Sequence, residues 1–500
     1  MISVLPLWLC LLTAQKPPET TIRTTTRLVH VNVVVRDRAG NPVAGLKQED
    51  FEIADEGVPQ QIRFFSAETS EAPPSPPPAV PEFVFSNQRA RGAARPGTVT
   101  AILFDSLNTA LTDLPYARQR VEKFIASLQP ADRVAFFSLG NELEVLHNFG
   151  DDPARLVKTF AKFRPPFVQS QTTRESTIAR TLQAMETIAH HVSGFPGRKN
   201  LVWVSSAFPL VTGLDTDADE PSGPLSSQSL SQMRNFADQI RHVALILNNA
   251  DLAIYPVDAR GLLSARPAQA DANIYAMQEI ARRTGGRAFF ERNDLDTGIR
   301  QVIDGSRVSY ALGYYPSAVR ADWSFHPITV RVRRPGLTVH CRKGYYDPGD
   351  FPQDIEYRKS AVRVVLAGPM EANGLALNAH VTPAETRGQV RVELRINAED
   401  LNMYFGGRDD FSTTRLDIAV VPMDNHHVSY LGTFDPFTVT LDQSNYEKAR
   451  RTGLWFRRTL DCHKKATLLK IVVRDRINGV MGSVTVPLSA IHSRRTEQQP

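Results

Sequence analysis

The chain has 500 residues, of which 42% are hydrophobic and 22% are charged, and this composition excludes wholesale disorder. At about 150 residues per domain, the length predicts roughly three domains. The formal net charge of +5 is too weak to indicate nucleic-acid binding, and the 3 cysteines are too few for a disulfide scaffold or a four-cysteine zinc site.

The first 14 residues form an apolar run, MISVLPLWLCLLTA, with no charge before Lys16. The run is shorter than the roughly 20 residues that a membrane-spanning helix needs, and it resembles the apolar part of a secretory signal peptide. We therefore expect residues 1–14 to be a signal peptide, no membrane span, and export to the periplasm, the cell surface or the medium. A short buried strand at the N-terminus is the alternative interpretation of this run.

Removal of such a leader leaves two cysteines, Cys341 and Cys462. An exported protein meets an oxidising environment, in which two thiols can form a disulfide. The two residues lie far apart along the chain, and nothing else in the sequence pairs them. We interpret them as free, buried thiols and keep a disulfide between them as the alternative.

Short β-branched runs predict a small β unit over residues 22–70. Six of the nine residues from 73 to 81 are proline, which cannot pair in the interior of a sheet, so we expect a stiff linker over 71–97. Strand patterns return at 308–348, and we expect this segment to complete the N-terminal β unit. The residues between would then be an insertion into that unit.

Strand and helix patterns alternate over residues 98–307. This alternation predicts right-handed crossovers and an α/β fold with a doubly wound, mainly parallel sheet, as in Rossmann-like proteins. Beyond it, residues 356–491 hold seven short strand patterns, beginning at 362–365, and no convincing long helix. We expect these residues to form a C-terminal β-sandwich.

A candidate site follows the first predicted strand of the α/β segment, which ends at Asp105. Ligands of doubly wound sheets bind at the carboxyl ends of the strands, and a hard divalent cation prefers oxygen ligands. Asp105 is followed by the hydroxyl and amide side chains of Ser106, Asn108 and Thr109. The alternative role for Asp105 is to hydrogen-bond the turn at the end of the strand, as aspartate commonly does.

Five short motifs, taken in their order and spacing, resemble the von Willebrand factor type A (VWA)-related proteins of the acidobacterial type. They are GLKQEDF (45–51), DSLNT (105–109), GRKNLVWVS (197–205), ARRTGG (281–286) and GYY (344–346). The resemblance implies a VWA-like α/β domain with β additions in an exported binding protein without known catalysis.

The same resemblance implies a metal-ion-dependent adhesion site for Mg²⁺, with Asp105, Thr109 and Thr177 as its ligands. Leu107 stands where the family has a serine ligand, and Ser205 and Ser206 stand where its second aspartate is expected. The implied site is therefore degenerate and would hold Mg²⁺ weakly. The rim expected to contact a partner consists of Asp105, Asn108, Thr109, Thr177 and Ser206.

These observations lead to one functional expectation and two alternatives. We expect an exported adhesion or protein-binding module that is not an enzyme, with an unidentified protein partner and no nucleic acid; its oligomeric state is left open. The first alternative is a structural scaffold for envelope or surface assembly that binds no metal. The second is an uncharacterised hydrolase, although the Gly-x-Ser-x-Gly, His-Glu-x-x-His, Walker and GxGxxG motifs are absent from the sequence.

Overall fold

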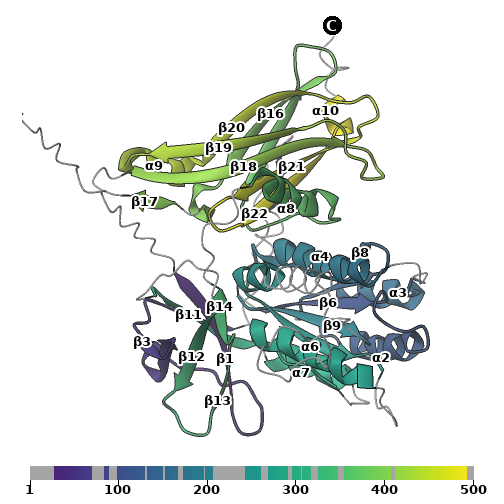
Figure 1. Cartoon of the computed structure of the whole chain (residues 1–500), viewed down its shortest axis with the longest axis vertical. Helices are drawn as coiled ribbons and strands as arrows, with labels where there is room; N and C mark the ends of the chain where they lie inside the picture. The colour runs from purple at the N-terminus through teal and green to yellow at the C-terminus, as the bar shows by residue number, and fades with distance from the viewer. Residues whose placement is uncertain are drawn as a thin grey trace, which may run out of the picture.

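The described part of the chain forms three units, arranged in the computed structural model as the lower left, lower right and upper parts of Figure 1. The expected signal peptide, residues 1–14, lies outside the described residues. No described helix is long and apolar enough to cross a membrane. The described residues are 28–69, 84–88, 98–129, 132–149, 152–166, 173–195, 197–206, 242–260, 268–290, 295–305, 307–316, 325–346, 354–401, 403–406 and 411–492.

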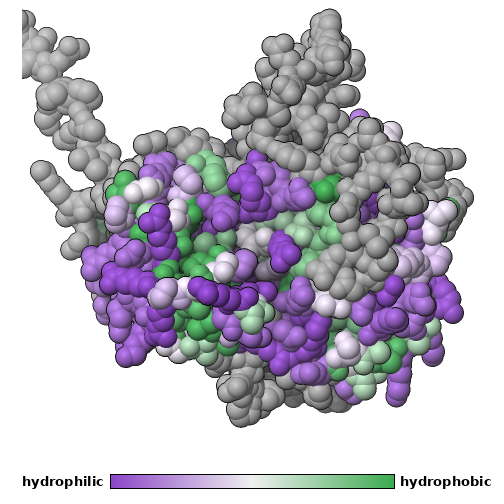
Figure 2. Space-filling model, turned by 90° about the horizontal axis from the view of Figure 1, so that it is seen from below, coloured by the Kyte–Doolittle hydropathy of each residue, from purple (hydrophilic) through white to green (hydrophobic). Residues whose placement is uncertain are grey.

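Two antiparallel sheets form the N-terminal β unit, and their strands come from both sides of the mixed-sheet unit described next. One sheet has the order β13 (Thr338–His340), β1 (Val29–Arg36), β11 (Val308–Tyr314) and β4 (Phe64–Thr69). The other has the order β14 (Gly344–Tyr346), β12 (Phe325–Val332), β2 (Phe51–Asp55) and β3 (Val58–Gln60), with the short helix η1 (Gln48–Asp50) before β2. Seen from below, the described surface shows hydrophilic residues with hydrophobic residues between them (Figure 2).

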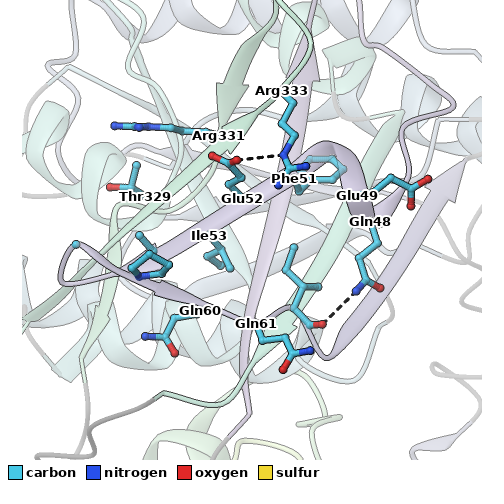
Figure 3. A pocket seen from close by; sticks show the side chains of 14 residues that line it. Gln48, Glu49, Phe51, Glu52, Ile53, Gln60, Gln61, Thr329, Arg331 and Arg333 are labelled. Carbon is cyan, nitrogen blue, oxygen red and sulfur yellow. Dashed lines mark hydrogen bonds and ion pairs between the residues drawn. The ribbon is translucent and has the colours of Figure 1, made fainter.

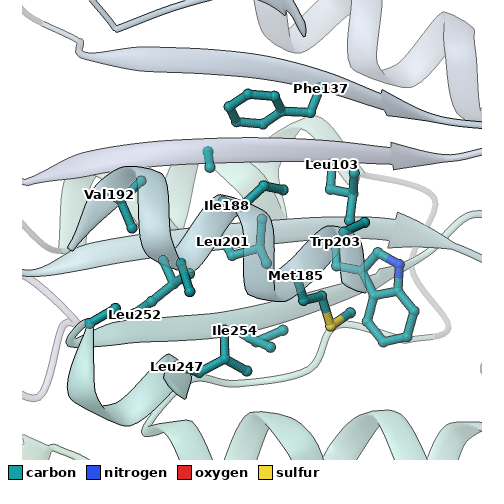
Figure 4. Close-up of a cluster of buried hydrophobic side chains, with 14 of the residues drawn as sticks. Leu103, Phe137, Met185, Ile188, Val192, Leu201, Trp203, Leu247, Leu252 and Ile254 are labelled. Carbon is teal, nitrogen blue, oxygen red and sulfur yellow. The ribbon is translucent and has the colours of Figure 1, made fainter. Parts of the chain in front are cut away.

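The second unit is built on a five-stranded mixed sheet with fully buried central strands. Its order is β10 (Leu252–Asp258), β9 (Lys199–Ser205), β6 (Val99–Asp105), β7 (Val134–Leu139) and β8 (Leu143–His147). The helices around it are α2 (Leu114–Ala126), α3 (Pro153–Lys162), α4 (Arg174–Val192), α6 (Ala268–Thr284) and α7 (Leu295–Gly305), and residues 242–249 are also helical. Apolar side chains of α4 pack on one face of the sheet, against Leu103, Leu201 and Trp203 (Figure 4).

The expected fold class, an α/β protein with a doubly wound and mainly parallel sheet, is wrong for this chain. Four of the five sheets formed by the described residues are antiparallel throughout, and the fifth is mixed. In that sheet β8 runs antiparallel to β7, because the chain reverses in a tight turn where Gly140 N donates to Glu142 O at 3.1 Å. The strand–helix alternation covers only one segment, whereas antiparallel pairings, many of them between strands far apart in the sequence, build the other sheets.

Two further antiparallel sheets form the C-terminal unit and pack against each other around a shared hydrophobic core. The first has the order β20 (Leu454–Asp461), β16 (Gln389–Ile396), β15 (Leu377–Pro383) and β5 (Val84–Ser86). The second contains β17 (Tyr404–Gly406), β18 (Phe411–Met423), β21 (Leu468–Asp475) and β22 (Met481–Pro487), with β19 (Thr433–Leu441) paired to β18. Helices α8 (Ile355–Ala367), α9 (Gln443–Thr452) and α10 (Ser489–His492) and the short helix η2 (Ala398–Asp400) complete the unit.

Two segments of this unit differ from the sequence-based expectation. Residues 362–365, expected as a strand, lie within α8, where Arg358 reaches the buried carboxylate of Asp417 on β18. The segment 71–97, expected as a linker, contains β5, which pairs with β15. Asn87 anchors β5, because its amide nitrogen donates to Ala372 O and Leu375 O, each at 2.8 Å. Cys341 and Cys462 are both free thiols.

The carboxyl end of α4 joins the mixed-sheet unit to the C-terminal unit. Asn373 N donates to His190 O at 2.9 Å, and Asn373 Nδ2 donates to His191 O at 2.7 Å. Gly194 lies against the same segment so closely that a Cβ atom at this position would be 2.0 Å from Asn373 O. The two units therefore pack directly, and a side chain at position 194 would push them apart.

A buried carboxylate lies at this junction. Glu186 on α4 is 6% exposed, and its Oε1 lies 3.5 Å from His190 Nε2 and 3.8 Å from His242 Nε2. Tyr357 on α8 approaches the same group, with its hydroxyl 3.2 Å from His242 Nδ1. Burial alone would raise the pKa of Glu186, but the two histidines outweigh it and lower the pKa to about 2.

We predict that Glu186 makes the free energy of unfolding depend on pH below about 4.5. A carboxyl pKa that folding lowers adds stability above the unfolded value, and this stability is lost as the pH falls toward about 2. The loss is on the order of 3 kcal/mol, and Glu186→Gln should remove it and flatten the profile. Urea unfolding between pH 7 and pH 2.5 measures this, with the exposed Glu122→Gln as control. A Glu186→Gln profile parallel to that of the unsubstituted protein would contradict the assignment.

Candidate functional site

Asp105, at the carboxyl end of β6, is fully buried and accepts four hydrogen bonds. Its Oδ1 accepts from Asn108 N at 3.0 Å. Its Oδ2 accepts from Asn108 Nδ2 at 2.7 Å, Trp203 Nε1 at 2.9 Å and Ser205 Oγ at 3.2 Å. A buried carboxylate is tolerated only when such donors replace the water it has lost, and here they come from within the chain.

Local structure explains why these donors meet. Side chains alternate along a strand, so Trp203 and Ser205 on β9 point to the same face of the sheet. β9 pairs in parallel with β6, which brings that face beside Asp105. The bond from Asn108 N to Asp105 Oδ1 spans three residues and closes an Asx-type turn after the strand. The alternative expected for Asp105, a turn-stabilising role, is thus part of the geometry.

Two further residues of the expected rim, Thr109 and Ser206, are also held internally. Thr109 Oγ1 donates to Asp105 O at 2.5 Å and accepts from Ser206 N at 3.2 Å. Ser206 Oγ donates to Asp113 Oδ2 at 2.9 Å. Both residues are buried, so their hydroxyl groups tie the loop after β6 to the end of β9 and do not face solvent.

Thr181, one helical turn beyond Thr177 on α4, takes part in this network and donates through Oγ1 to Thr177 O at 2.9 Å. Thr177 Oγ1 donates to Thr173 O at 3.2 Å, within the first turn of the helix. Asn108 Nδ2 donates to Thr181 Oγ1 at 2.8 Å. The structure therefore brings Asp105, Asn108, Thr109 and Ser206 together, and it connects Thr177 to them through its backbone carbonyl and Thr181. Because a helix repeats every 3.6 residues, Thr181 lies on the same face of α4 as Thr177. This spacing is the feature of the sequence from which Thr181 could have been predicted.

The residues around Asp105 do not fit a Mg²⁺ site. Mg²⁺ demands nearly octahedral oxygen coordination, whereas the Asp105 oxygens already face N–H and O–H donors. Asp258, at the end of β10 two strands away, is held by Arg260 at 2.9 and 2.8 Å. Burial raises the pKa of Asp105, and its hydrogen bonds only partly offset this rise. Within the described ranges, no group of three His, Cys, Asp or Glu side chains is placed to hold a metal.

A separate groove of about 780 Å³ lies on the N-terminal β unit, beside β2 and β12. Arg333 Nε and Glu52 Oε1 form an ion pair at 3.1 Å on its wall, and Gln48 Nε2 donates to Ile62 O at 3.1 Å (Figure 3). Its described lining residues include no serine, cysteine or histidine.

No protein-family model and no curated protein matches the chain. Among solved structures, an aerotolerance-related membrane protein from Bacteroides fragilis, with multiple mutations to serines, is 14% identical over 42% of this chain and 98% of its own, with a TM-score of 0.27. BatB, a conserved hypothetical protein from Bacteroides thetaiotaomicron, is 13% identical over 42% and 100%, with a TM-score of 0.26. Proximal thread matrix protein 1 from the mussel byssus, in a form with a zinc-occupied MIDAS motif, is 12% identical over 43% and 48%, also with a TM-score of 0.26. Structural similarities as weak as these do not indicate the function of this chain.

We predict that Trp203→Phe lowers the free energy of unfolding because it removes one of the donors to the buried Asp105 carboxylate. The loss of that hydrogen bond costs about 1–3 kcal/mol, and the smaller ring adds a packing cost. A double-mutant cycle with Asp105→Ala, measured by urea unfolding, separates the two terms. The substitution should cost less when Asp105 is absent. Equal costs in both backgrounds would show that the indole N–H does not stabilise the carboxylate.

Proposed function

We propose that the protein is an exported, non-enzymatic binding module of the adhesion type, which engages a protein partner at the loop edge of the mixed sheet without a bridging cation. The observation that carries the proposal is the internal saturation of Asp105. A cation-bridged contact needs an open coordination position for the partner's carboxylate, and this carboxylate is closed to solvent. In this proposal the side chains at the loop edge of the mixed sheet contact the protein partner directly.

Leu111 supplies the centre of such a contact. It is 56% exposed and follows Thr109 in the loop that the Asp105 network holds in place. Ala110 and Thr112 beside it are also exposed. An exposed apolar side chain on a loop that is fixed from below can pack against a partner without losing loop entropy on binding. In this proposal the buried members of the expected rim position the loop, and Leu111 contacts the partner.

The scaffold alternative has its own support in the junction at the end of α4. Asn373, His190 and His191 bond the mixed-sheet unit to the C-terminal unit directly. An assembly role needs such fixed packing between units and needs no ligand at Asp105. A binding module would have the loop around Leu111 covered by another protein in the cell, whereas a scaffold would leave this loop uncovered.

We predict that a photo-crosslinking amino acid at position 111 yields a discrete protein adduct in cells that export the protein. The same probe at Val157, an exposed apolar position on α3, is the matched control and should yield none. Added chelator should leave the yield at position 111 unchanged, because the contact needs no cation. Absence of an adduct at position 111 would favour the scaffold. An adduct that disappears with chelator would contradict recognition without a cation.

A further inference from the structure

The outer face of the sheet β20-β16-β15-β5 combines an exposed indole with several guanidinium groups. Alternation along these strands sends the apolar side chains inward, where they are buried against the second sheet. The outward side chains of the three longer strands are polar or aromatic. They are Asn378, His380 and Thr382 on β15, Gln389, Arg391, Glu393 and Arg395 on β16, and Trp455, Arg457, Thr459 and Asp461 on β20. We call this surface the Trp455 face.

The strand register sets these side chains in rows across the sheet. Trp455 pairs with Arg395, and Arg457 pairs with Glu393. Trp455 is 53% exposed, although tryptophan usually buries most of its large apolar surface. The four-residue step from Arg391 to Arg395 spans about 14 Å of β16. A linear ligand that contacts both arginines must therefore be several monomers long.

Charges on the Trp455 face leave an excess of positive groups. Glu393 Oε1 pairs with Arg457 Nε at 3.1 Å, and Glu393 Oε2 lies 3.9 Å from His380 Nδ1. Arg395 Nε donates to the carbonyl of Thr452 at 2.6 Å, and among the described residues no carboxylate forms an ion pair with it. Arg391 forms no ion pair with a described residue. Asp461 lies at the end of the same face and accepts from Gln389 Nε2 at 2.9 Å. Three guanidinium groups thus share the face with two carboxylates.

We propose that the Trp455 face binds an acidic polysaccharide. Guanidinium groups bind carboxylates with paired hydrogen bonds, and the indole offers a flat apolar surface on which the C–H face of a sugar ring can stack. The face is a sheet surface of alternating side chains, which suits a linear chain of rings lying across it. An acidic peptide in extended form would instead pair with the backbone at a sheet edge, and the charge of the whole chain is too weak to favour nucleic acid.

The test is isothermal titration of the full chain with oligogalacturonate, an uncharged glucose oligomer of equal length and polyglutamate. Oligogalacturonate should bind, more weakly at high salt, and should change the fluorescence of the exposed Trp455. Trp455→Ala should weaken binding about tenfold or more, and Arg391→Gln by about fivefold. The control is Phe411→Ala, a comparably exposed aromatic on the other sheet, which should leave the affinity unchanged.

Three results would overturn the proposal. One is no detectable binding of oligogalacturonate at millimolar concentration. Another is equal binding by the unsubstituted protein, Trp455→Ala and Arg391→Gln, each shown to be folded by circular dichroism. The third is tighter binding of polyglutamate than of oligogalacturonate, which would assign the face to an acidic polypeptide. The Trp455 face belongs to the C-terminal unit, whereas Leu111 lies in the loop after β6 of the mixed-sheet unit. A negative result for polysaccharide binding would therefore leave the proposed protein-binding function untouched.

Discussion

The buried carboxylate of Asp105 is the constraint on which the loop edge of the mixed sheet depends. A carboxylate removed from water is costly unless hydrogen-bond donors surround it. The chain meets this requirement from two places: the turn after β6, through Asn108, and the end of β9, through Trp203 and Ser205. Each donor fixes the element that carries it, so the network orders the loop that presents Leu111. The same saturation takes away the open position that a bridging cation would need.

Helix α4 connects this network to the rest of the molecule. Through Thr181 it receives a hydrogen bond from Asn108, and through His190 it accepts one from Asn373 of the C-terminal unit. Between these two contacts lies Glu186, buried against His242 at the junction. One continuous helix therefore contacts both the loop edge and the neighbouring unit. A displacement of α4 would disturb both, which explains why polar, specific contacts hold its carboxyl end.

The sequence predicted the parts of this arrangement that depend on local patterns. The strand that ends at Asp105 was evident from its continuous apolar run, and the turn-forming role of the aspartate was one of two open alternatives. The class of the whole chain could not be inferred from the alternation of one segment, because antiparallel pairings between distant strands, such as β5 with β15, build most of the sheets. The place of Thr181 in the network depends on how α4 packs, and no local pattern indicates that the indole N–H of Trp203 lies beside Asp105.

The indole N–H of Trp203 is the most direct reporter of this account. In a spectrum of the protein with ¹⁵N-labelled tryptophan, Trp203→Phe assigns the signal and the exposed Trp455 provides an internal reference. The account predicts that the Trp203 indole proton exchanges slowly with deuterium and that millimolar Mn²⁺ broadens its signal no more than that of Trp455. Selective broadening of the Trp203 signal by Mn²⁺ would place a cation at Asp105 and contradict the account.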